Sequence, residues 1–464
     1  RKEVKEMTAT RILAEYAANL KYEDLPEPVV FAVKQCLLDF LGVAIAGASE
    51  MPSRIMRDTC AGLLAGSGCN LLMAGFPPAG LLQAAMCNAA FGHALDMDDV
   101  HNGSIIHLAA VTIPAGLALS QARGCSGRSL VTAIVAGYEI GARIGLAVNP
   151  SSYYYWHTTA TVGSFTAAAV CASLLALTPA QAVQALGSAG TQAAGLWEFL
   201  ADGAMSKFLH CGKACLNGIL AAELAQNGYT AATRILEGEK GFVRAVAPAP
   251  NMAALTQDLG RTYRILENSF KPYPCCKHTH PAIYATLQIM NENGIRLDDV
   301  ESVMARVYSV AADLVGNQDP QTGYGCKFSL PYCVAAALFF GDVATNHFTE
   351  DCFHHPQLRS MLARVQVVVD REIEAIFHEN PHQWTQQIEI TTQSGKVLSK
   401  RIDFPKGDPA NPLSYDETTA KFHKLTMACL SEADRTHMVD RVSRLEALET
   451  ISELLPSSPP ARGV

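Results

Sequence analysis

TQQIEITTQSGKVLSKRIDF, residues 385–404, is a β-hairpin pattern in a chain whose other segments mostly predict helices. Apolar and polar residues alternate on both sides of Ser394-Gly395, which favours two strands joined by a tight turn. VQVVVD (365–370) and SVMARVYSV (302–310) predict two further strands. A helical pattern, HPAIYATLQIMNENG (280–294), precedes the strands, and another, LPYCVAAALFFG (330–341), lies between two of them. The sequence therefore predicts an α+β unit over residues 263–406.

Helical patterns flank this unit on both sides. ATRILAEYAANL (9–20) and the segment 26–47 show apolar spacings of three and four. LTPAQAVQALGSAG (177–190) begins with a capping box at Thr178 and Gln181. Amphipathic stretches return after residue 407. We predict a mainly α protein, with a large all-helical domain built from both chain ends (1–262 and 407–455). The smaller α+β lid domain (263–406) is inserted between them, and a disordered tail spans 456–464.

Composition narrows the class of protein. Hydrophobic residues make up 49% of the 464-residue chain and charged residues 17%, and the 34 glycines with many alanines favour closely packed helices. The net charge of −8, without a basic stretch, argues against nucleic acid as a partner. We see no signal peptide and no run of about 18 apolar residues, so we expect a soluble, cytoplasmic protein without a membrane partner. The 14 scattered cysteines are expected to be free thiols.

Four short segments combine charged or basic groups with small and apolar neighbours. They are LDMDDVHNGSIIH (95–107), YYYWHTTATVGS (153–164), GAMSKFLHCGKA (203–214) and SFKPYPCCKHTHPAI (269–283). The first could be a metal site, an acid–base site or a polar corner between two helices. Lysine and histidine in poorly solvated surroundings bind carboxylates and move protons near neutral pH. Such cations facing an acidic segment would suit a small polycarboxylate that loses a proton α to a carboxylate.

Familiar metal and nucleotide motifs do not account for these segments. His378 and His382 match HExxH, but Pro381 would break the helix that this zinc motif requires. The run CCKHTH (275–280) lacks the usual spacing of zinc ligands. GxSxG, GxGxxG and the P-loop pattern are absent from the sequence. We therefore expect no metal site.

The chain resembles the MmgE/PrpD family, which includes 2-methylcitrate dehydratase, cis-aconitate decarboxylase and iminodisuccinate epimerase. The resemblance extends from about Arg11 to Leu455. It is carried by LLDFLGVAIAG (37–47), ALDMDDVHNGSIIHLAAVTIPA (94–115), WHTTATVGSFTAAA (156–169), GAMSKFLHCGKACLNG (203–218) and FKPYPCCKHTHPAI (270–283). It implies an active site without a cofactor, a small di- or tricarboxylate substrate and a homodimer.

The resemblance also implies site residues. Those matching catalytic positions are Asp96, His107, Tyr154, His157 and Lys207, and those matching substrate-binding positions are Lys271, His278 and His280. His210, three residues after Lys207 and on the same helical face, is also expected to bind substrate. Asp98, Asp99 and His101 are expected to hold the corner in shape. Two departures concern the animal decarboxylases: Val100 replaces their threonine, and no match is found for their tyrosine after the first lid strand.

The reaction is a further expectation. One pocket can support dehydration, epimerisation or decarboxylation, and family breadth favours a dehydratase. Two rival hypotheses are a metal-dependent hydrolase, using Asp96, Asp98, His101 and the 275–280 cluster, and a non-catalytic carboxylate-binding protein on the same scaffold.

Overall fold

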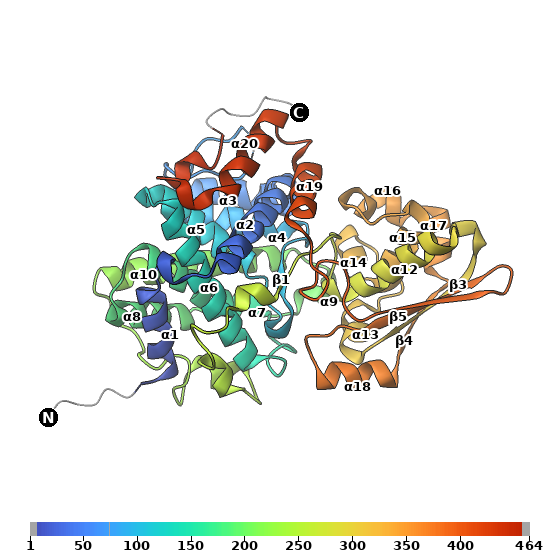
Figure 1. Cartoon of the computed structure of the whole chain (residues 1–464), viewed down its shortest axis with the longest axis horizontal. Helices are drawn as coiled ribbons and strands as arrows, with labels where there is room; N and C mark the ends of the chain where they lie inside the picture. Colours follow the sequence, from blue (N-terminus) through green and yellow to red (C-terminus); the bar gives the residue numbers. More distant parts are fainter. Residues whose placement is uncertain (1–6, 74, 457–464) are drawn as a thin grey trace. The chain divides into compact units, whose positions relative to one another are not determined.

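The structure is a computed structural model, which describes residues 7–73 and 75–456. The chain divides into two units (Figure 1). The helical unit comprises the chain up to Ala94, Asp98–Asn268 and the chain from Ser414 on. The α+β unit comprises Leu95–Met97 and Ser269–Leu413. The chain thus crosses between the units within the acidic segment, as well as near the predicted boundaries. The predicted tail lies outside the described residues, apart from Pro456.

Helices dominate the first unit, as predicted. They are α1 (Ala9–Asn19), α2 (Glu27–Gly47), α3 (Met51–Leu63), α4 (Leu81–Ala94), α5 (Ala109–Arg123), α6 (Gly127–Val148), α7 (Thr158–Leu174), α8 (Pro179–Gly190), α9 (Phe199–Asp202), α10 (Ser206–Gln226), α11 (Phe242–Val246), α19 (Tyr415–Thr426) and α20 (Glu432–Ser443). The strands β1 (Val100–His101) and β2 (Asn268–Ser269) have two residues each.

Small residues let α7 and α10 approach closely in the core of this unit. A Cβ atom on Gly218 of α10 would lie 2.4 Å from the Ala167 Cβ of α7. A Cβ atom on Gly163 of α7 would lie 3.0 Å from the Ala214 Cβ of α10. Larger side chains at these positions would force the two helices apart. The close packing expected from the alanine and glycine content is therefore present at the helix that carries Lys207.

The C-terminal helices return to the N-terminal ones. The Lys421 ammonium group on α19 lies 2.7 Å from the Asp39 carboxylate on α2, and both side chains are buried. Gln35 donates a hydrogen bond to the Thr418 hydroxyl between the same two helices, at 2.9 Å. Because a buried charge is costly without a partner, this ion pair fixes the pairing of the two helices. Both ends of the chain thus build one helical unit, as predicted.

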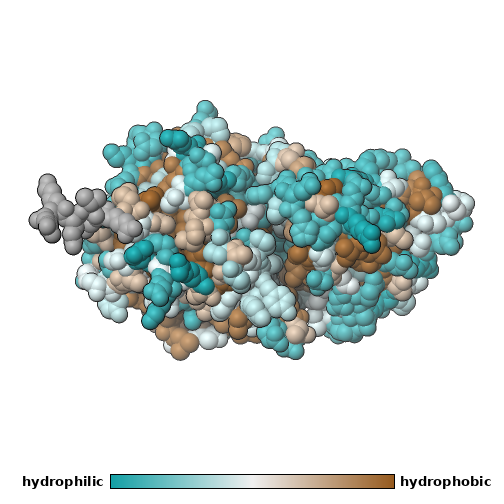
Figure 2. Space-filling model, turned by 90° about the horizontal axis from the view of Figure 1, so that it is seen from below, coloured by the Kyte–Doolittle hydropathy of each residue, from teal (hydrophilic) through white to brown (hydrophobic). Residues whose placement is uncertain are grey.

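Two helices satisfy the length and composition of a membrane span, contrary to the expectation that no such run exists. They are Glu27–Gly47 and Gly127–Val148, and 78% and 94% of their apolar windows are buried within the structure. Core helices pass the same test because they are apolar on all sides. On the face drawn in Figure 2, hydrophobic residues form small patches among hydrophilic ones.

The α+β unit contains a four-stranded sheet with the strand order β4-β3-β5-β6. Its strands are β3 (Val300–Val307), β4 (Val365–Val369), β5 (Gln386–Thr392) and β6 (Val397–Ile402). Its helices are α12 (His280–Asn293), α13 (Ser309–Val315), α14 (Gly323–Lys327), α15 (Leu330–Phe340), α16 (Glu350–Phe353), α17 (Pro356–Leu362) and α18 (Arg371–Glu379). In Figure 1, α12 and α15 lie on the same side of the strands.

The predicted hairpin forms the edge of this sheet. Strands β5 and β6 pair antiparallel, with Ile388 opposite Lys400 and Ile390 opposite Leu398. Gly395 adopts a φ of 79° in the connecting turn, which glycine tolerates without strain. Every second residue of β5 is buried, and α12 packs against both hairpin strands. The alternation read from the sequence therefore corresponds to one buried and one less buried face.

Candidate active site

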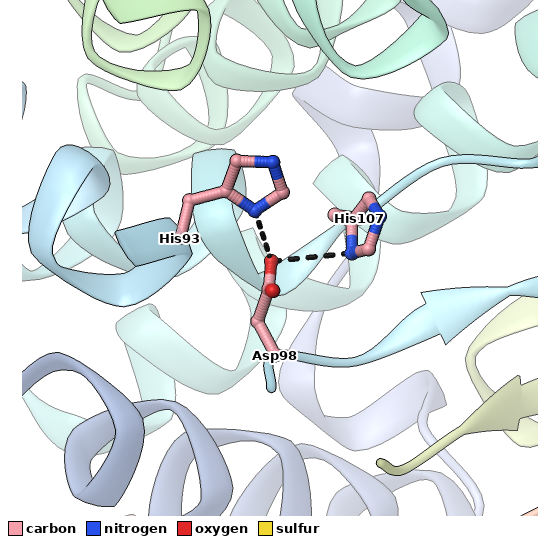
Figure 3. A group of neighbouring side chains, drawn as sticks. All are labelled: His93, Asp98 and His107. Carbon is pink, nitrogen blue, oxygen red and sulfur yellow. Dashed lines mark hydrogen bonds and ion pairs between the residues drawn. The ribbon is translucent and has the colours of Figure 1, made fainter. Parts of the chain in front are cut away.

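One carboxylate of the helical unit holds two imidazole rings (Figure 3). His93 lies in the last turn of α4, and its Nδ1 is 2.7 Å from the Asp98 Oδ2. His107 precedes α5, and its Nδ1 is 3.2 Å from the same oxygen. Asp98 and His93 are fully buried, whereas the His107 side chain is 14% exposed. We call His93, Asp98 and His107 the acid–base cluster.

Hydrogen bonding defines the tautomer of His107. Its Nδ1 lies 2.7 Å from the backbone carbonyl oxygen of Asp99, which can only accept a hydrogen bond. The Nδ1 atom therefore carries a proton, which it shares between this carbonyl and the Asp98 carboxylate. In the neutral ring, Nε2 is then left with the lone pair that accepts a proton. This is the arrangement in which a carboxylate orients a histidine for acid–base work.

Two further histidines and a lysine belong to the same unit. His157 is the N-cap residue of α7, and its Nδ1 lies 3.0 Å from the Nδ1 of His210 on α10. The His157 ring stacks on that of His93, with 5.9 Å between the centroids. Lys207 is 2% exposed in the first turn of α10. Of the predicted site residues, the structure thus places His107, His157, Lys207 and His210 near one another, together with His93.

Burial favours the neutral form of three of these rings, those of His93, His157 and His210. It lowers the pKa of His93 to about 4, although the Asp98 carboxylate opposes the shift. Burial, followed by the Lys207 charge, lowers the pKa of His210 to about 4. Burial and the neighbouring histidines hold the pKa of His157 well below its ordinary value. The pKa of Asp98 is held well below its ordinary value because the two histidines outweigh the effect of burial. Near neutral pH, the group has one carboxylate among uncharged buried rings.

Some polar atoms of this group have no protein partner among the described residues. They are His93 Nε2, His157 Nε2 and Asp98 Oδ1, all of them buried. An unpaired buried polar atom is costly, so such atoms gather where a polar ligand binds. This group can therefore bind a polar molecule and exchange a proton with it.

Neighbouring residues of the acidic segment have structural roles. The Asp99 carboxylate accepts hydrogen bonds from the Tyr138 hydroxyl at 2.5 Å and from the Ala109 backbone amide at 3.0 Å. His101 caps a short 3-10 helix by accepting the Ser104 amide hydrogen bond. Asp99 and His101 hold the corner in shape, as predicted. Asp98 does not share that role, because its carboxylate is the centre of the acid–base cluster.

Tyr154 is not brought to the cluster. Its side chain is 82% exposed and contacts the Tyr155 ring edge-on, with 4.8 Å between the centroids. A group so accessible to water has no fixed position toward a buried substrate. The structure therefore gives no support to an acid–base role for Tyr154.

The α+β unit contains a second buried cluster, which is rich in lysine. The Lys271 ammonium group donates to the Asp96 carbonyl oxygen at 2.9 Å and lies 3.3 Å from the Asp96 carboxylate. The Lys327 ammonium group donates to the Leu95 carbonyl oxygen at 2.9 Å. Asp96 adopts a left-handed backbone with a φ of 56°. Asp96, predicted as a catalytic residue, thus contacts Lys271 within the α+β unit rather than belonging to the acid–base cluster.

His278 and His280 are also buried in this unit. The His278 Nδ1 lies 2.5 Å from the Tyr308 hydroxyl, and its ring stacks on Trp384 at 4.2 Å. Burial, followed by the Lys271 charge, lowers the pKa of His278 to about 3. The His280 Nε2 lies 3.2 Å from the Cys275 carbonyl oxygen, while its Nδ1 has no partner among the described residues. Both rings lie in the unit that contains Lys271, and burial also holds the pKa of His280 well below its ordinary value.

The geometry also bears on metal binding. Among the described residues, only His93, Asp98 and His107 place three ligand atoms close enough to hold one ion. This group shares only Asp98 with the rival set of Asp96, Asp98, His101 and the 275–280 cluster. A ring nitrogen that carries a proton cannot ligate a metal. The hydrogen bond to the Asp99 carbonyl oxygen requires that proton on the His107 Nδ1. The residues therefore fit a hydrogen-bonded acid–base group better than a metal site.

The HExxH match does not lie on one continuous helix. Helix α18 ends at Glu379, before Pro381 and His382. His378 is exposed and pairs with Glu374 one turn earlier. The two histidines therefore do not share a helix, as the proline predicted.

Sequence reasoning missed His93 and Lys327. His93 stands at the end of an apolar helix, five residues before Asp98, so a polar side chain in that last turn was a usable signal. Lys327 lies between predicted elements, and nothing in its local pattern separates it from a surface lysine.

Comparison with known proteins identifies the family of the chain. Residues 11–254 match the MmgE/PrpD N-terminal domain, and residues 273–445 match the MmgE/PrpD C-terminal domain. The chain is 26% identical to the cis-aconitate decarboxylase-like protein oryM of Aspergillus oryzae, over 97% of both chains. It is 26% identical to a cis-aconitate decarboxylase of Aspergillus terreus, over 96% of this chain and 95% of that one. It is 25% identical to the Homo sapiens cis-aconitate decarboxylase, over 94% and 91%. The chain belongs to the MmgE/PrpD family.

Proposed function

We propose that this protein is a lyase that decarboxylates a small unsaturated tricarboxylate of the cis-aconitate type. The observation that carries the proposal is the acid–base cluster, in which Asp98 orients His107 and leaves its Nε2 to exchange a proton. The names of the relatives favour decarboxylation over the dehydration that family breadth favoured.

The chemistry has a simple requirement. When a carboxylate on a carbon next to a double bond leaves as CO₂, the electron pair shifts the double bond and a proton is taken up at carbon. One proton is consumed for each CO₂. Dehydration instead needs a base for the proton and an acid for the departing hydroxide.

We assign the proton to His107. Its partly exposed ring can be recharged from solvent between turnovers, and the Asp98 carboxylate stabilises the imidazolium that forms. The neutral His93 and His157 rings offer uncharged hydrogen-bonding atoms, and Lys207 offers a buried positive charge for a substrate carboxylate. These roles require only groups that the helical unit itself contains.

A reaction panel tests this proposal. Purified protein is incubated in D₂O with cis-aconitate, citrate, 2-methylcitrate and iminodisuccinate, and products are followed by NMR. Decarboxylation predicts CO₂ release from cis-aconitate and one deuterium on carbon in the product. Loss of water from 2-methylcitrate, or racemisation of iminodisuccinate, would replace the proposed reaction by dehydration or epimerisation. Activity lost with a stoichiometric metal and restored by it would overturn the assignment to side chains alone.

A further inference from the structure

Two histidine rings meet through their Nδ1 atoms where α7 and α10 begin. His157 is the N-cap residue of α7, and His210 lies near the start of α10. The two Nδ1 atoms are 3.0 Å apart, and the ring planes make an angle of 39°. This is the distance of a hydrogen bond, so one proton lies between the two nitrogens.

The loop before α9 holds this pair of rings in place. The Gly195 carbonyl oxygen accepts a hydrogen bond from the His157 backbone amide at 3.1 Å. Gly195 has a φ of 149°, and a Cβ atom there would lie 2.2 Å from the Ala160 Cβ. Only glycine therefore fits at this position. The Phe199 ring meets the His210 ring edge-on, with 5.5 Å between the centroids, so His210 is packed as well as hydrogen-bonded.

The shared hydrogen bond links the tautomers of the two rings. A neutral imidazole has one N–H group and one nitrogen with a lone pair, so one Nδ1 donates and the other accepts. If the His210 Nδ1 donates, the proton of His157 is on its Nε2. If the His157 Nδ1 donates, its Nε2 has the lone pair instead. The tautomer of the buried His157 ring thus depends on the partly exposed His210 ring.

The surroundings disfavour a positive charge on either ring. Burial, together with His93, His210, Lys207 and His107, holds the pKa of His157 well below its ordinary value. Burial, followed by the Lys207 charge, lowers the pKa of His210 to about 4. Near neutral pH the pair therefore consists of two neutral rings. Beyond the shared proton, it has one more, on one of the two Nε2 atoms.

The Nε2 atom of His157 indicates which tautomer a ligand requires. It is buried and has no partner among the described residues. The Lys207 charge, which acts on both rings, attracts an anionic ligand to this place. A carboxylate oxygen can only accept a hydrogen bond, so it requires the proton on the His157 Nε2.

We propose that His210 is a positioning residue that acts through His157. It donates its Nδ1 proton to the His157 Nδ1 and so keeps a proton on the His157 Nε2, which donates to a substrate carboxylate. His210 itself does not contact the substrate in this arrangement, unlike the substrate-binding role expected from the sequence. The inference rests on the proposed function for the class of substrate alone.

Nitrogen NMR of the native protein tests the tautomers. In protein with ¹⁵N-labelled histidine, scalar coupling between the two Nδ1 nuclei reports their shared hydrogen bond. Titration with cis-aconitate and with citrate at pH 7 is expected to place the His157 proton on Nε2. Absence of the coupling, or a bound carboxylate with the His157 proton on Nδ1, would overturn the proposal.

Two variants separate the hydrogen bond from simple packing. His210→Phe keeps a ring against Phe199 but removes the donor, and we expect KM to rise by about tenfold. We expect kcat to change by less than about threefold, because the carboxylate is held alike in the ground and transition states. His210→Asn restores an N–H donor and is expected to recover most of the loss in KM. If His210 only fills space, the order reverses, with the smaller Asn variant the weaker one.

The role of His210 and the proposed decarboxylation fail in different ways. Turnover of cis-aconitate with the proton of bound-state His157 on Nδ1 would overturn the role of His210 alone. Binding of cis-aconitate without turnover, with the proton on His157 Nε2, would support that role and overturn the decarboxylation. If neither cis-aconitate nor citrate binds, both proposals are wrong.

Discussion

The acid–base cluster and the lysine cluster are both buried, but they differ in the charges that they hold. In the helical unit, one carboxylate orients His93 and His107, and burial keeps the surrounding rings uncharged. In the α+β unit, the buried Lys271 and Lys327 side chains donate to backbone carbonyls, and Lys271 also lies beside Asp96. The first arrangement leaves ring nitrogens ready to exchange protons, and the second fixes positive charge in place. We infer that proton transfer belongs to the helical cluster and charge complementarity to the lysine cluster.

The largest expected effect comes from Asp98. Asp98→Asn keeps the size of the side chain but removes the charge that orients and stabilises the His107 ring. We expect kcat to fall by about 10⁴-fold, as in other carboxylate–histidine pairs, with near-native unfolding. Steady-state kinetics measures this fall in kcat, with the substrate that the D₂O reaction panel identifies.

Asp99→Asn is the matched control. Burial raises the pKa of Asp99 to about 7, so an amide resembles the neutral acid that this residue readily forms. We expect less than about a tenfold change in kcat. A comparable loss in both variants would mean that the whole corner, and not the Asp98 carboxylate, sets the rate.

The lysine cluster should show its role in stability. Lys271→Met leaves the buried Asp96 carboxylate without its cation, and we expect about 3–5 kcal/mol less unfolding free energy. Adding Asp96→Asn should recover most of that loss. Urea denaturation measures both. The more exposed pair of Lys400 and Glu292 provides the control, because Lys400→Met should cost less than about 1 kcal/mol. A small effect of Lys271→Met would show that the lysine cluster is well solvated.

His278 makes the stability depend on pH. Its pKa is about 3 in the folded protein, through burial and then the Lys271 charge, against 6.5 as its ordinary value. Between these values the unfolded chain binds the proton and the folded chain does not, so stability falls on acidification. From pH 7 to pH 5, we expect the wild type to lose about 2 kcal/mol relative to His278→Phe. Chemical denaturation of both proteins at several pH values measures the difference. Parallel pH curves would contradict a neutral buried ring.

The smallest expected effect is that of Tyr154. Because its side chain is largely exposed, Tyr154→Phe should change kcat/KM by less than about twofold and leave the unfolding free energy within about 0.5 kcal/mol. A large loss of activity with unchanged stability would show that Tyr154 takes part in the reaction. It would also weaken the contrast between the two clusters.

The periodicity of the sequence predicted the helices and strands better than it predicted the side-chain contacts between them. The sequence was enough to predict features that depend on neighbouring residues: the hairpin, the Thr178 capping box and the helix that carries Lys207. The roles within LDMDDVHNGSIIH could not be predicted in this way, since the left-handed backbone at Asp96 decides where each carboxylate lies. Family resemblance selected Asp96, whereas the geometry places Asp98 with His93 and His107. His93 was missed because only the fold brings the end of α4 to Asp98.

The three residues Leu95–Met97 have a consequence for protein engineering. They belong to the α+β unit, although about 170 residues of the helical unit separate them from the rest of it. A fragment spanning 269–413 would therefore lack the carbonyl oxygens that Lys271 and Lys327 bind, and the Asp96 carboxylate. Excising or exchanging this unit as one continuous piece would leave two buried ammonium groups without these partners. Domain exchange between relatives should therefore transfer the 95–97 segment together with the insert.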